Sequence, residues 1–224
     1  MAKREADLIG HFGARGSGKT FSAQQRVRKA PMRRLLVFDP VHQWGEFGTV
    51  TGSLQEVLAM MRNNGRWAQS FKIVYRPPDI GAVKIQDKRA PYSVHAFESL
   101  CRFAFRCEKM RLVGEELDLV TKAGWSGPHW QAMALRGRHA EIEAIGISQR
   151  PALVDKNFYS NASIIRTGRL NDDNDLKRLA SALRVPLTEV AALVGYEAIE
   201  RDMTTGAIVR FDEKGKKKRQ PRRR

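Results

Sequence analysis

Eight residues near the N-terminus, GARGSGKT at positions 13–20, match the pattern G-x-x-x-x-G-K-[ST]. The glycines let backbone N–H groups turn toward phosphate oxygens at the start of a helix, where the helix dipole favours anions. Lys19 is placed to reach the β- and γ-phosphates of a nucleotide, and the Thr20 hydroxyl to hold Mg²⁺. We therefore predict that ATP and Mg²⁺ bind to Gly13, Ala14, Arg15, Gly16, Ser17, Gly18, Lys19, Thr20 and Phe21.

Two adjacent acids, Glu115 and Glu116, end the apolar stretch MRLVGEE. A phosphate-binding loop of this kind works with an acid on a neighbouring strand. We predict that Glu115 holds the Mg²⁺ shell through a water, together with Thr20, and that Glu116 deprotonates the attacking water. Adjacent carboxylates at a strand end repel each other, so a cation would relieve a real cost. The alternative is a solvated acidic loop that also includes Asp118.

A scaffold must bring these residues together, and the order of apolar patterns indicates which one. Short apolar runs alternate with helical patterns, which is typical of a doubly wound α/β fold with a mainly parallel central sheet. Strands are predicted at residues 6–12, 33–40, 71–77, 110–116, 142–148 and 162–168. Helices are predicted at 18–30, after a capping box formed by Ser53 and Glu56, at 92–107, at 172–184 and between Pro186 and Gly195. Residues 77–91 are predicted to be a loop, and 196–211 a closing hairpin.

Positive charge divides the chain into a body and a tail. The net charge is +16, and half of it comes from the last eleven residues, KGKKKRQPRRR. We therefore predict one ATPase domain at residues 1–211 and a basic, disordered tail at 212–224. A basic body with a basic tail favours double-stranded DNA as the partner. The alternative for the tail is a solubilising end with no partner.

The N-terminal stretch, the apolar runs and the cysteines bear on where the protein is located. The N-terminal apolar stretch is too short for a signal peptide, and no run approaches the roughly 18 apolar residues of a membrane span. Cys101 and Cys107 match neither a redox pair nor a zinc site. We expect a cytoplasmic protein with no membrane anchor and with both thiols reduced in the core.

Five segments of the chain resemble the FtsK–HerA group of P-loop motors, and most of all the small viral genome-packaging ATPases such as those of tectiviruses. The segments occur in the order seen in that group: GARGSGKT, LLVFDPVHQWGEF, LVGEELD, LRGRHAEIEAIGISQRP and ASIIRTGRLNDDNDLKRL. The resemblance covers roughly residues 9–179. Its specificity comes from combining the P-loop with DP after the second strand, GRH before the fifth and SQRP after it. The chain departs from the group at Glu115, where Asp is usual.

The resemblance implies an activity and a set of partners. It implies an ATPase that translocates DNA and packages a viral genome into a preformed capsid. It also implies a homo-oligomeric ring, a hexamer or a pentamer, that docks on capsid or portal proteins at the packaging vertex. Such a motor is expected in the host cytoplasm or on the virion at that vertex.

The resemblance also implies roles for individual residues. Gln149, after the fifth strand, would contact the γ-phosphate or the attacking water. Pro151 would stop that strand, and Arg150 would point toward the nucleotide or DNA. Arg138 of the GRH segment would reach the γ-phosphate bound by the next subunit. The other candidates for this arginine finger are Arg136, Arg150 and Arg166.

Several alternatives stay open on the sequence alone. A P-loop also occurs in nucleotide and small-molecule kinases, in non-packaging DNA pumps and, in degenerate form, in non-catalytic scaffolds. Trp44 is either part of the DP element or an ordinary packing residue. The aromatic residues of TKAGWSGPHW line a DNA pore or pack against a neighbouring subunit: Trp125, His129 and Trp130.

Overall fold

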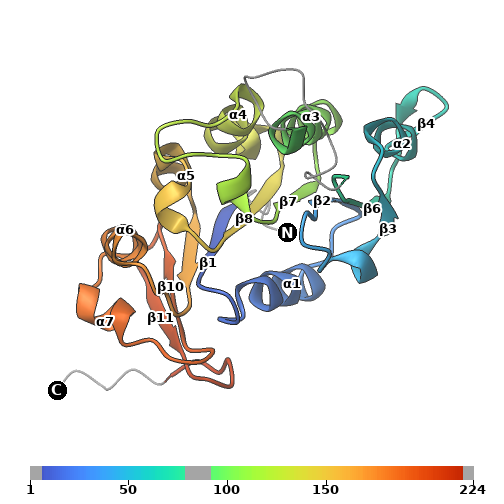
Figure 1. The fold of residues 1–224 in the computed structure, drawn as a ribbon. Helices are drawn as coiled ribbons and strands as arrows, with labels where there is room; N and C mark the ends of the chain where they lie inside the picture. The colour runs from blue at the N-terminus through green and yellow to red at the C-terminus, as the bar shows by residue number, and fades with distance from the viewer. Residues whose placement is uncertain (1–6, 79–91, 219–224) are drawn as a thin grey trace.

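The computed structural model describes residues 7–78 and 92–218, and its main feature is one nine-stranded sheet. The strands of this sheet are β1 (Leu8–Phe12), β2 (Arg34–Phe38), β3 (Thr49–Thr51), β6 (Phe71–Tyr75), β7 (Arg111–Gly114), β8 (Glu143–Ser148), β9 (Ile164–Thr167), β10 (Ala198–Asp202) and β11 (Ile208–Phe211). They lie in the order β11-β10-β9-β1-β8-β7-β2-β6-β3 (Figure 1). Within this sheet, the strands from β9 across to β3 pair in parallel. At the β9 edge, β10 and β11 add an antiparallel hairpin. The predicted fold class is confirmed.

Helices cover both faces of this sheet. They are α1 (Lys19–Lys29), α2 (Leu54–Met60), α3 (Tyr92–Cys107), α4 (Pro128–Arg136), α5 (Lys156–Asn161), α6 (Asp173–Leu183) and α7 (Leu187–Ala191). Helix α1 lies on one face, and α3, α4 and α5 gather on the other (Figure 1). Every residue of β1 and of β8 is buried. This burial explains why both strands appear in the sequence as mainly apolar runs.

The elements that the sequence did not reveal are short or lie at the edge. They are β3, the small hairpin of β4 (Arg62–Asn63) and β5 (Arg66–Trp67), and helices α4 and α5. Helices of nine and six residues show too few turns for a helical period to stand out. Tertiary contacts place them instead, because the ring of Trp130 on α4 stacks on that of Phe158 on α5, with centroids 5.9 Å apart.

The helix cap at Ser53 forms only in part as predicted. The Ser53 hydroxyl accepts a hydrogen bond from the Glu56 backbone N–H at 3.3 Å. The Glu56 carboxylate, however, accepts the Thr51 hydroxyl proton, and the Ser53 backbone N–H donates to Thr51 Oγ1 at 3.0 Å. Thr51 on β3 thus replaces the reciprocal half of the capping box.

The C-terminal residues form more structure than the sequence suggested. Disorder is predicted from residue 212 onward, yet residues 212–218 turn back onto β11. The Lys218 backbone N–H donates to the Arg210 carbonyl at 2.7 Å, and the Lys218 ammonium pairs with Glu197. The prediction is therefore wrong for residues 212–218, while 219–224 lie outside the described residues, as do 79–91 of the predicted loop.

Two further sequence expectations concern the cysteines and the membrane. Cys101 and Cys107 are buried free thiols on α3, as predicted. Within residues 7–78 and 92–218, no helix combines the length and the apolar composition that a membrane span requires.

Candidate active site

The predicted P-loop joins the carboxyl end of β1 to the first turn of α1. Gly13, Gly16 and Gly18 have φ angles of 151°, 77° and 80°. Residues with a Cβ rarely adopt these values, so the backbone path requires glycine. Gly18 is the N-cap of α1 and directs the free N–H groups of the helix toward the loop. The loop therefore has the backbone geometry of an anion cradle.

Two neighbouring segments hold the P-loop in place. The Gly13 N–H donates to the Ser148 carbonyl at the end of β8, at 3.3 Å. The Ala14 N–H donates to the Arg169 carbonyl at 2.7 Å, and the Arg169 guanidinium donates to the Arg15 carbonyl at 3.2 Å. Sequence reasoning missed Arg169, because its main contacts run through backbone atoms that no side-chain pattern encodes.

Glu115 lies next to Thr20, the residue with which it is predicted to hold the metal. One carboxylate oxygen accepts the Thr20 hydroxyl proton and the other the Trp44 indole N–H, both at 2.8 Å. The side chain is fully buried. Burial raises the pKa of Glu115 to about 7, further raised by the Glu116 charge, although the bonds from Trp44 and Thr20 lower it.

A buried aspartate positions Trp44 for this contact. Asp39 accepts hydrogen bonds from the backbone N–H groups of Gln43 at 2.8 Å and Trp44 at 3.1 Å, and Arg76 pairs with it at 3.0 Å. Trp44 is itself fully buried and packs on Phe47. Trp44 is therefore a packing residue, as one of the two hypotheses states, and it also donates to the acid pair.

Glu116, the predicted general base, meets Lys19 and Gln149 at the carboxyl edge of the sheet. Its Oε1 accepts the Gln149 side-chain N–H at 2.6 Å and lies 3.9 Å from the Lys19 ammonium. Its backbone adopts a left-handed φ of 53°, a conformation that clusters at functional sites. Burial raises its pKa, while the Gln149 hydrogen bond and the Lys19 charge lower it. The structure thus brings together Lys19 at the start of α1, Glu116 after β7 and Gln149 after β8.

The acid pair suits a divalent cation. Thr20 gives its hydroxyl proton to Glu115, so the oxygen lone pairs stay available to a metal. Two adjacent buried carboxylates beside one lysine leave negative charge to be neutralised. Among the described residues no cluster of three or more His, Cys, Asp or Glu could hold a metal alone. Mg²⁺ fits this arrangement, since it commonly binds through few protein groups and takes water and nucleotide phosphates as its other ligands.

Comparison with known proteins supplies relatives for this architecture. No family model matches the chain. Protein P9 of Pseudoalteromonas phage PM2 is 24% identical over 132 residues, which cover 57% of this chain and 60% of Protein P9, less than two thirds of its length. The genome packaging NTPase B204 of Sulfolobus turreted icosahedral virus 2, solved with AMPPCP, superimposes with a TM-score of 0.67 at 18% identity. That match covers 90% of this chain and 95% of B204.

A second solved structure extends the comparison beyond viruses. VirB4 of Thermoanaerobacter pseudethanolicus matches with a TM-score of 0.63 at 12% identity, over 90% of this chain and 88% of VirB4. The chain therefore shares the fold of these two solved structures. The resemblance that the motifs indicated is thereby confirmed at the level of the fold.

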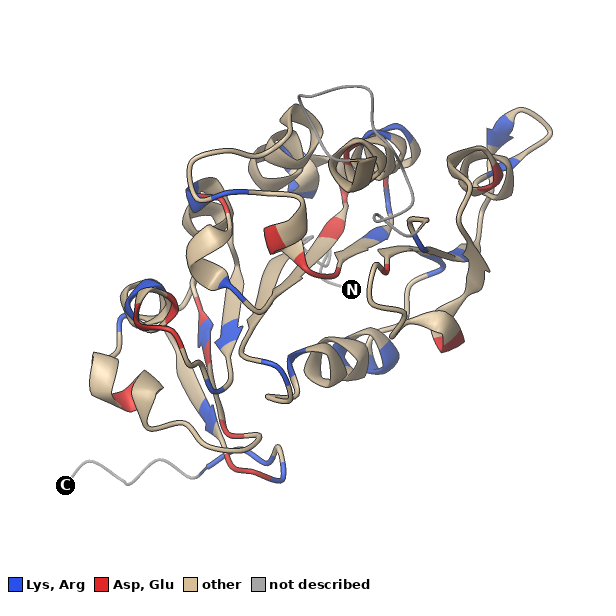
Figure 2. Ribbon diagram, in the orientation of Figure 1, with Lys and Arg blue, Asp and Glu red and all other residues tan. Residues whose placement is uncertain are grey.

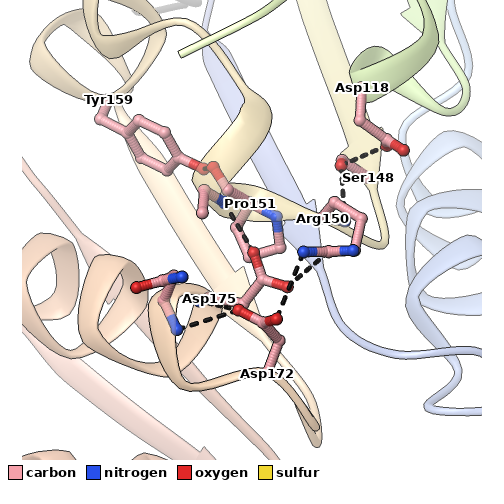
Figure 3. A network of polar contacts seen from close by, with 9 residues as sticks. Asp118, Ser148, Arg150, Pro151, Tyr159, Asp172 and Asp175 are labelled. Atoms are coloured by element: carbon pink, nitrogen blue, oxygen red, sulfur yellow. Dashed lines mark hydrogen bonds and ion pairs between the residues drawn. The ribbon is translucent and has the colours of Figure 1, made fainter.

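In this P-loop ATPase fold, Arg150 has a structural partner. Its guanidinium bonds Asp175 at 2.9 Å and Asp172 at 3.3 Å, at the start of α6 (Figure 3). Asp175 also accepts the Ala152 backbone N–H at 2.8 Å. The prediction that Arg150 points toward the nucleotide or DNA is therefore wrong. Two carboxylates on a neighbouring helix, distant in sequence, decide its direction.

Pro151, which is predicted to stop β8, comes three residues after the strand has ended at Ser148. It begins the 3-10 turn Pro151–Leu153, and its carbonyl accepts the Tyr159 hydroxyl at 2.6 Å (Figure 3). Ser148, the last residue of the strand, bonds Asp118 through its hydroxyl. The segment after β8 that carries Gln149 is therefore anchored on both sides of that residue.

The four candidate finger arginines lie in different settings. Arg136 and Arg138 are exposed at the end of α4 and in the turn Gly137–Ala140, which precede β8. Arg138 is therefore at the amino edge of the sheet, opposite the P-loop. Arg166 on β9 instead lies 3.6 Å from Glu200 and over the Phe211 ring, 3.8 Å from its centroid. Arg150 and Arg166 thus have partners inside the chain.

The predicted aromatic segment does not behave as one unit. Trp130 is buried in the core of its own chain, against Phe97 and Phe158, so both hypotheses for this residue are wrong. His129 bonds Glu98, whereas Trp125 is 46% exposed. Trp125 is therefore accessible to a partner, and so is part of the His129 side chain, which is 42% exposed.

The acid pair predicts how stability depends on pH. The folded-state pKa of Glu115, about 7, lies above its ordinary 4.5. A raised pKa contributes stability at low pH that is lost as the pH rises through 7. Without Mg²⁺ or nucleotide, the free energy of unfolding of the wild type should therefore fall between about pH 5 and about pH 8 relative to Glu115→Gln, by at most about 3 kcal/mol.

Urea denaturation across that range measures the difference. The glutamine variant is the reference because its amide does not titrate, while Glu116 titrates in both proteins. Identical pH profiles for the two proteins would contradict the raised pKa of Glu115.

Proposed function

We propose that this chain is an ATP-hydrolysing DNA translocase that packages a viral genome into a preformed capsid, working as a homo-oligomeric ring. The observation that carries the proposal is the meeting of Lys19, Glu116 and Gln149 beside the P-loop. The fold shared with the genome packaging NTPase B204 supports the biological setting.

The hydrolytic step follows from these three residues. A water oxygen attacks the γ-phosphorus while the bond to the β–γ bridging oxygen breaks, and Glu116 takes the water proton. ADP and phosphate are the products. Lys19 binds the γ-phosphate oxygens, and the Gln149 amide orients the Glu116 carboxylate and senses the γ-phosphate. Bound Mg²⁺, held by Thr20 and through a water by Glu115, would neutralise charge on the β- and γ-oxygens.

Charge supports a nucleic-acid partner. The chain carries a net charge of +16. Figure 2 shows Lys and Arg on elements at both faces of the sheet, so the folded body contributes to the positive field as well as the tail. Such a field attracts DNA phosphates independently of base sequence. Double-stranded DNA, a second copy of this chain and a capsid or portal protein are therefore the proposed partners, in the host cytoplasm or at the virion vertex.

The decisive test is ATP hydrolysis by the purified chain with and without linear double-stranded DNA. DNA should stimulate phosphate release several-fold, since a motor couples turnover to its track, and Lys19→Ala should be inactive in both conditions. A rate of ATP hydrolysis that DNA does not change would contradict the proposed motor function. Transfer of phosphate to a nucleoside or small molecule instead of water would indicate a kinase.

A deletion in the same assay separates the tail from the body. Removing residues 219–224 leaves the Lys218 contacts in place and deletes four cations. The log–log dependence of DNA affinity on salt should flatten by at most about 3.6, because each neutralised phosphate contributes roughly 0.9. ATP turnover without DNA should stay at the wild-type rate. An unchanged salt dependence would assign the tail to a protein partner or to solubility.

A further inference from the structure

A large pocket adjoins the P-loop on the side away from Glu116 and Gln149. Its volume is about 970 Å³, and it lies between α1 and the hairpin of β10 and β11. Glu116 and Gln149 follow β7 and β8, whereas the pocket lies toward β9, β10 and β11 on the other side of β1. A nucleotide whose γ-phosphate faces Glu116 must extend its nucleoside away from β8. The sheet order therefore directs the nucleoside into this pocket.

Two aromatic side chains at the P-loop end of the pocket are unusually exposed. Phe21 on α1 is 62% exposed and Tyr196, just before β10, is 61% exposed. Both line the pocket together with Gly18 and Lys19. The Tyr196 ring lies against the P-loop backbone, because a Cβ added at Gly18 would be 3.1 Å from Tyr196 Cδ1. An exposed ring at this place offers a stacking surface for a base.

The wall of the pocket also holds a polar group that lacks a partner. His11 on β1 lines the pocket and is 1% exposed, and neither ring nitrogen finds a hydrogen-bond partner among the described residues. Its burial, together with the charges of Arg26 and Arg166, lowers its pKa, so the ring is neutral with one donor and one acceptor. Buried polar groups are rarely left unsatisfied. A ligand hydroxyl or ring nitrogen inside the pocket would satisfy this one.

We propose that the nucleoside of the bound nucleotide occupies this pocket and that its base stacks on Tyr196. This inference rests on the proposed ATPase function and deepens it, since it assigns the base to the C-terminal hairpin and leaves the phosphates to the P-loop. Tyr196 is then a binding residue that no phosphate-binding motif contains. The pocket volume lies within the range of small-molecule sites, roughly 300–1,000 Å³.

The test compares two ligands that share the phosphates and differ in the nucleoside. Calorimetry of the full chain would measure the affinity for MgATP and for magnesium tripolyphosphate. Tyr196→Ala should weaken MgATP binding about ten-fold, the typical scale of a lost stacking contact, and leave tripolyphosphate binding unchanged. Tyr196→Phe keeps the ring and should bind both ligands like the wild type. Trp125→Ala removes an aromatic residue of similar exposure elsewhere and should also change neither affinity.

Each other outcome decides against the proposal. An unchanged MgATP affinity in Tyr196→Ala would place the base elsewhere. Equal weakening of both ligands would show that Tyr196 only supports the P-loop backbone at Gly18. Lys19→Ala should weaken the binding of both ligands. This variant shows the result that the loss of a phosphate contact gives. If the wild type bound neither ligand, the ATPase function itself would fail, and that result differs from every result in which only the Tyr196 variant changes.

Discussion

Replacing Glu116 with glutamine is expected to lower ATP turnover about a thousand-fold, within the range of lost general-base catalysis, while ATP still binds. The amide keeps the size of the side chain but has no basic oxygen to take the water proton. The P-loop contacts with phosphate are kept, because Lys19 does not depend on a hydrogen bond to Glu116: its ammonium lies 3.9 Å from Glu116 Oε1. The variant should therefore accumulate as an ATP-bound, stalled protein.

Single-turnover hydrolysis and equilibrium ATP binding measure the two effects separately. Asp118→Asn is the matched control, since this carboxylate lies two residues further on and bonds Ser148. It should retain most of the turnover. Wild-type turnover by Glu116→Gln would remove Glu116 from the role of base. A deficit confined to Glu115→Gln would transfer that role to the neighbouring acid.

Arg138→Ala is expected to lower turnover by about three orders of magnitude or more, the usual effect of losing an arginine finger. Arg138 is exposed at the amino edge of β8, whereas Gln149 follows the carboxyl end of the same strand. The six residues of β8 span about 20 Å, so Arg138 cannot reach the γ-phosphate of its own subunit. In a head-to-tail ring two different surfaces meet, which allows one subunit's amino edge to face the next subunit's P-loop.

Mixing two inactive variants tests action between subunits. Lys19→Ala lacks a working P-loop, and Arg138→Ala lacks the finger. In mixed rings some interfaces pair an intact P-loop with an intact Arg138, so turnover should partly return as the ratio approaches equality. Arg102→Ala, an exposed arginine on α3, controls for the loss of surface charge and should stay active.

Two results would contradict this assignment. No recovery in the mixtures, with subunit exchange demonstrated by labelled protein, would exclude action between subunits. Full turnover by Arg138→Ala alone would move the finger to Arg136, the exposed candidate at the end of α4. Arg150 and Arg166 are weaker candidates because their guanidinium groups are already paired with acids.

Local patterns in the sequence were sufficient for the parts of the site that depend on neighbouring residues. A P-loop is one continuous turn whose glycines must adopt positive φ, so GARGSGKT can be recognised without tertiary structure. Strands covered on both faces appear as apolar runs, so the main parallel strands and the carboxyl edge where they end could be predicted. That edge brings Lys19, Glu116 and Gln149 together, as the parallel order requires.

Contacts between distant segments were decided only by the tertiary structure. Trp44 donates to Glu115 across 71 positions, because Asp39 fixes the loop that carries Trp44. Arg150 turns to α6 and Trp130 into the core, although both residues fit other roles in the linear sequence. The direction of a long side chain depends on which partner can replace its lost water contacts. That partner comes from packing, which a single segment of sequence does not encode.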